Sequence, residues 1–531
     1  MNLFRSHFKG TIRLAFPLLY LYILVVMIVM LTLYDWLTIF SLIFVCILDF
    51  FVTIVAFYLF QWLPDVKIQN LPRQDSRKGA AVFLFTFLMT FSFYMLYFTA
   101  TYPDGLLVEG SDTLNQYLQA TGVNPYNDWH PVLHTVLFFT LPLKLIDNIS
   151  FVIFMQLLYF CLAVSYLVFV LYRSNAPGIF LLGLCLYICL NPYLAGWMVY
   201  PVKDSALTIF AITLTAYYVR IIVSRGAWLS KPRNIILFAL IAVGCTYMRH
   251  NALLFTVPLI LTVLFYAVRT KKTRFLTTLA VISVYAFVRL LYAFLDVQSP
   301  DYRTEEKIGL PVSIWCNVMY ENPEALPEET REVMYTLVPK EYINQLDIRE
   351  GFNSIKFLGD NYWDNLDKLS YSDVLKYTYQ CFRYAPKESM EALTSLIGMI
   401  LSVDVRILPI NVIAGINHLA LNETLFNRLQ TFTSQLVTLF SNSPFHILFG
   451  SFGFINLSMV ITALVLFARN RFSILHALPL LCYNTGTMLF LSGKEYRYFI
   501  FTYPLWLVTI FLMLQDQTCF DSRGNKSPRQ I

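Results

Sequence analysis

Long apolar runs separated by short polar segments organise this sequence. A helix needs about 20 apolar residues to cross a membrane, and runs of roughly this length recur along most of the chain. The expected crossings lie near residues 14–33, 37–60, 80–100, 149–172, 177–199, 203–220, 235–249, 250–267, 275–295, 446–468, 472–491 and 497–515. The pattern predicts an all-α polytopic membrane protein with a bundle of about twelve transmembrane helices.

One apolar run, residues 235–267, is too long for one crossing and short for two full ones. The polar sequence TYMRHN interrupts it in the middle. We therefore expect two short or partial helices that meet at Arg249 and His250. A guanidinium at such a break needs a partner or an anionic ligand.

Composition supports a membrane location and excludes nucleic acid as a partner. Of the 531 residues, 57% are hydrophobic and only 14% are charged, whereas about a quarter are charged in ordinary soluble domains. The net charge is +6, but the basic residues occur in short clusters between apolar runs, as the positive-inside rule describes. These clusters predict that both termini are cytoplasmic. The first run is expected to be a retained helix, because it has span length and lacks a small-residue cleavage site.

The cysteines indicate at most one disulfide bond and no metal site. Most of the nine cysteines lie in apolar runs, where a thiol behaves as a small hydrophobe. Only Cys316 and Cys381 are placed to pair in an oxidising compartment. No metal-type cysteine spacing is present.

The first outer loop, residues 101–148, has an unusual composition for a membrane protein. Its segment 102–135 contains no Lys or Arg. Its acidic residues and histidines are Asp104, Glu109, Asp112, Asp128, His130 and His134. We therefore expect a negative local field where two apolar runs end.

Periodicity predicts two helices in this loop. Ser111 can cap a short helix that ends at Gly122. Asp112, Asn115, Gln116 and Gln119 would share its polar face, and the helix would lie along the membrane surface. Pro131 fits the first turn of a second helix on which His130 and His134 share a side.

The composition divides the chain into three parts. Residues 1–296 form a transmembrane module that carries the first outer loop. Residues 297–445 form an extracytoplasmic, α-rich domain with interfacial segments, and no crossing is expected in 391–445. Residues 446–531 form the last transmembrane helices and a basic cytoplasmic tail.

On this topology four polar clusters meet at the outer interface. The clusters are the Asp112 loop, Lys203-Asp204, Arg249-His250-Asn251 and Lys494 to Arg497. A carboxylate facing cations at a lipid boundary suits a reaction that deprotonates a hydroxyl and releases a phosphate. The ordinary alternative is that the cations snorkel to the interface and the carboxylates are solvated.

We assign candidate roles accordingly. Asp112 is the expected base, with Asp128 and Glu109 as further catalytic candidates. Lys203, Arg249 and Arg497 would bind the phosphate. The supporting residues would be Gln116, His130, His134, Asp204, Asn251 and Glu495. Alternatively, Asp112 with Glu109 or Asp128 could bind a divalent cation, Mg²⁺ or Mn²⁺. His130 and His134 have the spacing of a zinc-binding helix, but two histidines alone define no zinc site.

Several of these segments resemble a known family. The acidic first outer loop, HPVLHT, the Lys-Asp pair that opens a helix, the partial helices around an Arg, and the late EYRY look like the GT-C superfamily of polyprenyl-phosphate-dependent glycosyltransferases. HPVLHT is similar to the HPPL-type element of protein O-mannosyltransferases, without the second Pro. SDTLNQYLQATG, WHPVLHT, VKD and MRHN resemble an uncharacterised bacterial group of GT-C-like multipass proteins.

The resemblance implies a GT-C-like bundle in a bacterial plasma membrane, with an outward-facing active site and inverting transfer. Its partners would be membrane lipids, a polyprenyl-phosphate-linked sugar donor, and a cell-envelope glycan, lipid or protein acceptor. By the same resemblance, Asp112 matches the loop carboxylate, and Arg249 or Arg497 the donor-phosphate contacts.

Two other functions fit the same pattern. A transporter or flippase of lipid-linked saccharide would place charges along a path at the membrane midplane. A polysaccharide polymerase would also use Arg-rich outer loops, although the acidic first loop argues against it. Here the charges gather at one interface, which favours the transferase.

Overall fold

The structure is a computed structural model of the chain. It describes residues 2–34, 36–61, 76–101, 111–268, 270–298, 308–348, 351–356, 358, 363–403, 431, 435, 438–439, 444–468, 473–490, 493 and 496–515. Within these residues every regular element is a helix, apart from one isolated β-bridge between Asn127 and Gln298. The all-α prediction is confirmed for this part of the chain.

Most of the expected crossings are long apolar helices. Eight helical segments of the described chain are long and apolar enough to span a membrane, and a bent pair makes nine if it counts as one span. The helices concerned are α1 (Asn2–Leu33), α2 (Ile39–Gln61), α3 (Ser76–Thr101), α7 (Ile149–Arg173), α10 (Lys203–Val223), α12 (Leu253–Thr262) with its flanking turns, α13 (Lys271–Phe294) and α24 (Thr502–Gln515). These are the helices of a multi-pass membrane protein.

The bent pair corrects the expected single helix at 177–199. Helices α8 (Gly178–Leu190) and α9 (Pro192–Met198) meet at an angle of 60°. Pro192 cannot donate a backbone hydrogen bond, and the Asn191 side chain caps α9 by accepting from the Leu194 N–H at 3.0 Å. The Asn191 amide also donates to the Phe449 carbonyl at 2.9 Å, so the break is fixed from both sides.

The break predicted at Arg249 is confirmed. Helix α11 (Pro232–Met248) ends there, and the short turn η3 (His250–Ala252) leads into α12. Arg249 itself has an extended backbone, with φ −159° and ψ 137°. Its side chain therefore leaves the chain at a point where neither helix continues.

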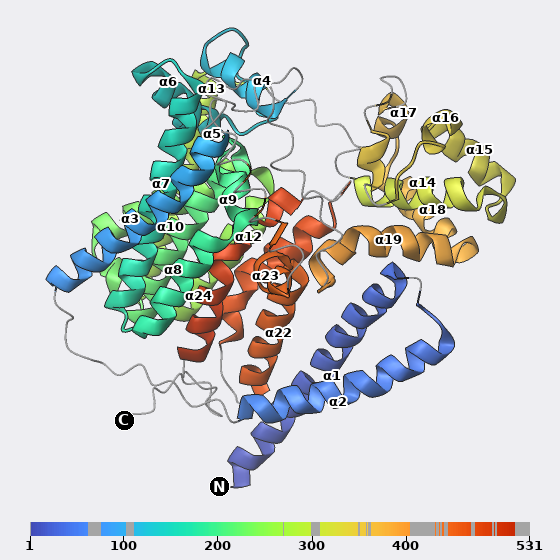
Figure 1. The fold of residues 1–531 in the computed structure, drawn as a ribbon, viewed down its shortest axis with the longest axis horizontal. Helices are drawn as coiled ribbons and strands as arrows, with labels where there is room; N and C mark the ends of the chain where they lie inside the picture. Colours follow the sequence, from blue (N-terminus) through green and yellow to red (C-terminus); the bar gives the residue numbers. More distant parts are fainter. Residues whose placement is uncertain are drawn as a thin grey trace.

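The core of the bundle lies around α7 and α10, which Figure 1 shows between α3, α8 and α24. Phe160, Leu157 and Ile212 are fully buried in this core. The last helices, α21 (Phe445–Gly450), α22 (Phe452–Ala468) and α23 (Ile474–Met488), complete it. Helices α22 and α23 pack beside α12, α24 and α1, and α21 packs against α9 and α22.

Residues after 308 form a second, smaller helical unit with its own core. It contains α14 (Gly309–Glu321), α15 (Glu328–Leu337), α16 (Lys340–Ile343), α17 (Trp363–Asp367), α18 (Tyr371–Tyr384) and α19 (Pro386–Leu401). Trp315 and Phe352 are buried at its centre. Cys316 and Cys381, the expected pair, are both buried free thiols there. Helix α19 is not among the candidate spans and packs against α1 and α22.

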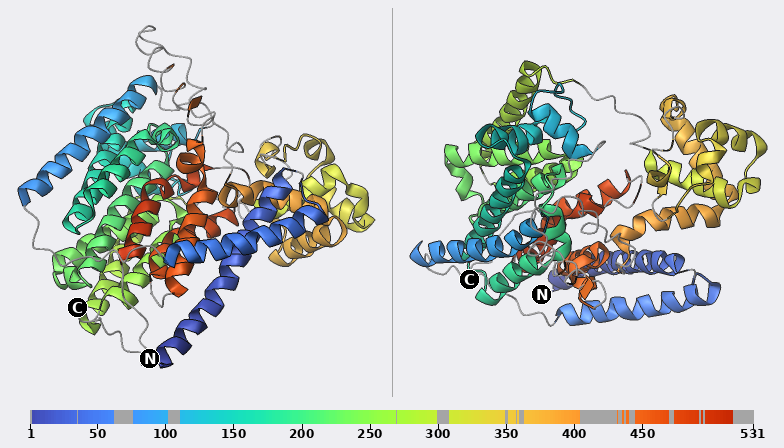
Figure 2. Two further views of the ribbon diagram at one scale, coloured as in Figure 1. Left: turned by 60° about the horizontal axis from the view of Figure 1, so that its bottom comes forward. Right: turned by 45° about the horizontal axis from the view of Figure 1, so that its top comes forward.

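The two ends of the bundle differ. Figure 1 shows α4 and α14 to α18 toward the upper part of the molecule, while the beginning of α1 and the end of α24 lie below. Figure 2 shows the same separation of the α14 to α18 unit from the bundle around α7 and α10. The predicted topology and its orientation relative to the cytoplasm stay predictions.

Candidate functional site

Helix α4 (Asp112–Ala120) begins and ends as the sequence predicts. The Ser111 hydroxyl accepts from the Leu114 N–H at 3.1 Å, and Gly122 follows the helix with φ +78°, a conformation that favours glycine. Its polar face turns into the protein, however, because Gln116 and Gln119 are buried. The helix packs against the π-turn η1 (Thr135–Thr140), and Gln119 on its buried face accepts from the Asn127 N–H at 3.4 Å.

The chain after α4 is tied to the end of α13. The Gln298 N–H donates to the Tyr126 carbonyl at 2.8 Å, and the Asp128 N–H donates to the Gln298 carbonyl at 3.1 Å. Next comes α5 (Val132–His134), which continues through η1 into α6 (Leu141–Leu145). The Leu133 N–H donates to the Tyr292 hydroxyl at 2.9 Å. These bonds hold His130 in place at 2% exposure.

Asp112, His130 and Lys203 form a chain of polar contacts. Lys203 Nζ lies 3.2 Å from His130 Nδ1. An ammonium group can only donate, so Nδ1 must accept and the imidazole proton resides on Nε2. That nitrogen lies 3.5 Å from Asp112 Oδ1. Lys203 therefore fixes the tautomer in which His130 carries its proton on Nε2, the nitrogen near the Asp112 carboxylate.

Electrostatics keeps Asp112 ionised and His130 neutral. Burial raises the pKa of Asp112, but His130, Lys203 and Arg497 together outweigh it, so that the pKa lies below its usual value. Burial, followed by the Lys203 charge, lowers the pKa of His130 to about 3. At neutral pH the site therefore presents a carboxylate beside a neutral imidazole.

Arg497 completes the surroundings of Asp112. Its guanidinium nitrogen lies 3.5 Å from Asp112 Oδ2. The same guanidinium lies 5.6 Å from the ring centroid of Tyr498 and 6.0 Å from that of Trp197. The two Asp112 oxygens thus face different partners, His130 and Arg497, and 36% of the side chain stays exposed.

Arg249 has a partner within the protein. It forms an ion pair with Asp204, which is 1% exposed in the first turn of α10. The Arg249 guanidinium also lies 3.6 Å from the ring centroid of Tyr498. The partner that the sequence required for Arg249 is therefore Asp204, and a phosphate contact by Arg249 stays a prediction.

The charges of this cluster do not cancel. Three cations (Lys203, Arg249 and Arg497) accompany two carboxylates (Asp112 and Asp204), while His130 is neutral. Among the described residues of this cluster the excess is one positive charge. Since Asp204 pairs with Arg249, this excess lies on the Lys203 and Arg497 side, next to Asp112.

Asp128 lies in a neighbouring cluster. His250 Nε2 donates to the Asp128 backbone carbonyl at 2.9 Å, and Asp128 Oδ1 accepts from the Val132 N–H at 3.4 Å. Burial raises the pKa of Asp128, although His250, the Val132 N–H and Arg289 oppose that shift. The carboxylate is thus used to hold the start of α5.

Two supporting candidates are buried without hydrogen bonds. Among the described residues, neither amide atom of Gln116 and neither ring nitrogen of His134 has a partner. Both side chains are fully buried. The His134 ring lies 5.3 Å from that of Phe138 and 5.7 Å from that of Phe139, the surroundings of a core histidine.

The remaining sequence candidates have different outcomes. The Asn251 amide donates to the Thr487 hydroxyl at 2.9 Å, which joins η3 to α23. Glu109 and Glu495 lie outside the described residues. The described residues hold no group of three or more His, Cys, Asp or Glu side chains that could bind a metal ion.

Sequence reasoning missed two aromatic residues. Tyr498 lies between the guanidinium groups of Arg249 and Arg497, and Trp197 lies beside Arg497. The sequence did contain a signal for these two residues. Tyr498 directly follows the predicted outer cluster Lys494 to Arg497, and Trp197 lies at the outer end of a predicted crossing. Aromatic rings beside cations stabilise them when water is scarce.

No protein-family model, curated protein or solved structure matches this chain. The function is therefore argued from the site itself.

Proposed function

We propose that this protein is a membrane glycosyltransferase of the GT-C type. It transfers a sugar from a polyprenyl-phosphate-linked donor to a cell-envelope acceptor at the outer face. The supporting observation is the ionised Asp112 carboxylate, which His130 and Arg497 orient beside an excess of positive charge. A base next to an anion-binding group is what phosphate release from a sugar requires.

Each group has a place in the proposed reaction. The acceptor hydroxyl gives its proton to Asp112 while its oxygen forms a bond to the anomeric carbon of the sugar. The bond from that carbon to the phosphate oxygen breaks on the opposite side, so the configuration inverts. The phosphate leaves with the electron pair, and Lys203 and Arg497 stabilise its charge.

Lys203, His130 and Asp204 set the geometry of this step. Lys203 holds His130 in one tautomer, with the proton on Nε2, 3.5 Å from Asp112 Oδ1. Asp204 neutralises Arg249, and we assign the phosphate to Lys203 and Arg497, the cations next to Asp112. A carboxylate whose pKa is lowered is a weak base, and it works best when proton transfer is late, after the acceptor oxygen has begun to bond.

The described donor set around Asp112 does not fit a divalent cation well. His130 and Arg497 already contact the two carboxylate oxygens, and Lys203 adds further positive charge. Mg²⁺ and Mn²⁺ prefer several oxygen ligands. We therefore derive no step through a metal.

We also propose that the bundle crosses the membrane about twelve times. The eight candidate spans and the bent pair of α8 and α9 would be joined by α11, α22 and α23. Helices α11 and α22 have 17 residues and α23 has 15, about 23–26 Å of helix. Flanking residues would complete these crossings of a hydrocarbon layer about 30 Å thick.

Purified protein in proteoliposomes can test the function. Synthetic short-chain polyprenyl-phosphate hexoses and pentoses are supplied as a donor panel, together with an extract of envelope glycans as acceptor. Mass spectrometry then measures the release of free polyprenyl phosphate. The proposal predicts release from at least one donor together with a mass increase in an acceptor.

Two other results would replace the proposal. Movement of an intact donor between leaflets, without release of polyprenyl phosphate, would identify a flippase. Extension of a glycan by whole repeat units would identify a polymerase.

A further inference from the structure

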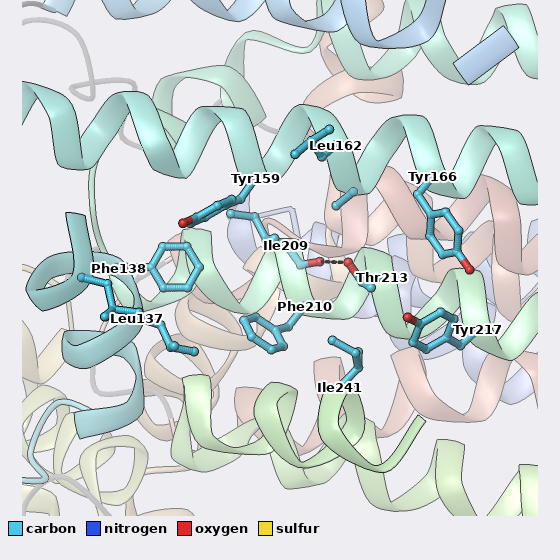
Figure 3. A pocket seen from close by; sticks show the side chains of 12 residues that line it. Leu137, Phe138, Tyr159, Leu162, Tyr166, Ile209, Phe210, Thr213, Tyr217 and Ile241 are labelled. Atoms are coloured by element: carbon cyan, nitrogen blue, oxygen red, sulfur yellow. Dashed lines mark hydrogen bonds between the residues drawn. The ribbon is translucent and has the colours of Figure 1, made fainter. Parts of the chain in front are cut away.

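An apolar groove runs along the membrane-spanning part of the bundle. It has a volume of about 530 Å³ and lies between η1, α6, α7, α10 and α11. Figure 3 shows its lining, with Leu137 and Phe138 at one end and Tyr166 and Tyr217 at the other. Leu141 and Leu162, which also line it, are 48% and 40% exposed. The groove therefore opens toward the surface that lipid covers in a membrane.

The far end of the groove carries polar groups. The Tyr166 and Tyr217 hydroxyls lie there (Figure 3), and Arg220 Nη1 donates to the Tyr166 hydroxyl at 2.9 Å. The Arg220 guanidinium also lies 5.5 Å from the Trp228 ring. A guanidinium has five N–H donors, so most of its capacity remains for a ligand at this end.

The protein surface around Arg220 is strongly basic. Residues 205–295 contain no Asp or Glu. Arg225 and Lys231 are exposed in the loop that follows α10, and Arg233 is exposed in the first turn of α11. A Cβ on Gly226, whose φ is +80°, would lie 2.7 Å from the Ala267 carbonyl oxygen, so this loop packs against the residues that lead into a second basic segment at 271–274.

We propose that this groove binds an anionic phospholipid. One acyl chain fills the apolar groove, and the phosphate is bound by Arg220 and the neighbouring basic loop. The excess of basic residues marks this side as cytoplasmic, and basic pockets between helices on that side bind anionic headgroups. Tyr166, which contacts Arg220, lies at the other end of the groove from Phe138 (Figure 3), beside which His134 lies, so the site does not depend on the proposed reaction.

Two independent observations support the choice of ligand. The groove alone would accept any lipid chain, including a polyprenyl chain, because it is apolar and open to the bilayer. The Arg220 end selects the headgroup, because residues 205–295 offer no carboxylate to the cation that a zwitterionic headgroup carries. The combination favours a phospholipid with net negative charge.

Native mass spectrometry of the full chain can test the proposal. The protein is released from nanodiscs that contain equal amounts of phosphatidylglycerol and phosphatidylcholine, and the retained lipid is counted. We expect about one phosphatidylglycerol per protein to persist. Arg220→Gln should lower its retention at least tenfold, and Arg220→Lys should keep part of it.

Substitutions that fill the groove test whether an acyl chain occupies it. Ala163→Phe and Thr213→Phe each add volume in the groove, and each should reduce phosphatidylglycerol retention while unfolding within a few degrees of the wild type. The matched control is Arg289→Gln, which removes an arginine from α13, away from the groove. It should retain lipid normally.

Three results would overturn the proposal. The first is equal retention of phosphatidylcholine and phosphatidylglycerol. The second is retention unaffected by both Arg220→Gln and whichever groove variant is folded. The third is displacement of phosphatidylglycerol from the groove by a short-chain polyprenyl phosphate at equal concentration, which would make the groove a site for the donor chain.

Discussion

Replacing Asp204 with asparagine should destabilise the protein strongly. Asp204 is 1% exposed and the Arg249 side chain is 10% exposed, so water and salt screen this ion pair little. The amide of the variant could still accept one hydrogen bond, but it would leave the guanidinium charge without a counter-charge. The variant therefore separates a structural role for Arg249 from a role in binding phosphate.

The magnitude follows from the burial of the pair. Removing one partner of a buried ion pair typically costs about 3–5 kcal/mol. The Tyr498 ring, 3.6 Å from the Arg249 guanidinium, contacts it in both the wild type and the variant, so it does not change this difference. We expect a loss of about 3–5 kcal/mol for Asp204→Asn. The double variant Asp204→Asn/Arg249→Gln should recover part of it, because no buried charge remains.

Thermal unfolding in detergent can measure this difference. A dye that fluoresces on reaction with thiols will report unfolding, because Cys161 and Cys245 are fully buried. The single variant should unfold at a lower temperature than both the wild type and the double variant. Two results would show that Arg249 does not depend on Asp204 and is available to the donor phosphate. One is that Asp204→Asn unfolds at the same temperature as the wild type. The other is that the effects of the two substitutions on the unfolding temperature add in the double variant.

Three further predictions concern binding, pH and topology. Lys203→Gln should weaken binding of a short-chain polyprenyl phosphate about tenfold or more, because a charge-assisted hydrogen bond is worth about 1.5–3 kcal/mol; titration calorimetry measures this, and unchanged affinity would remove Lys203 from the site. The pKa of His130 is about 3 in the folded protein and near 6.5 in the unfolded chain, so stability should be full above pH 6.5 and fall by about 2 kcal/mol by pH 5. His130→Asn should flatten that part of the pH profile of the unfolding temperature, and an identical profile would contradict the assignment. A tag inserted after Pro386 should be reachable by an impermeant reagent in intact cells; protection of this tag would place the α14 to α19 unit on the cytoplasmic side.

Local signals made much of the site's framework predictable. The Ser111 cap, the end of α4 at Gly122 and the helix break at Arg249 all depend on residues close in sequence. Capping groups and helix breakers act within a few residues. For the same reason the sequence placed Lys203 correctly at the start of α10.

The pairings within the site could not be predicted in this way. The ion pair of Arg249 with Asp204 joins α10 to the α11–α12 break, and Arg497 reaches Asp112 from the far end of the chain. Such contacts depend on how the helices pack, and many packings would have placed the same charges at the same depth. The inward polar face of α4 was missed for a related reason, because an amphipathic pattern alone does not say whether lipid or protein covers the apolar side.

The most direct test of the central claim is the rate of sugar transfer by Asp112→Asn. The substitution keeps the size of the side chain and removes its ability to accept a proton. Since general base catalysis contributes about 100-fold or more, donor turnover should fall at least that far, while donor affinity and unfolding temperature change little. Asp147→Asn, an exposed carboxylate in the same outer loop, should transfer at the wild-type rate. Wild-type turnover by Asp112→Asn would contradict the claim that this carboxylate is the base.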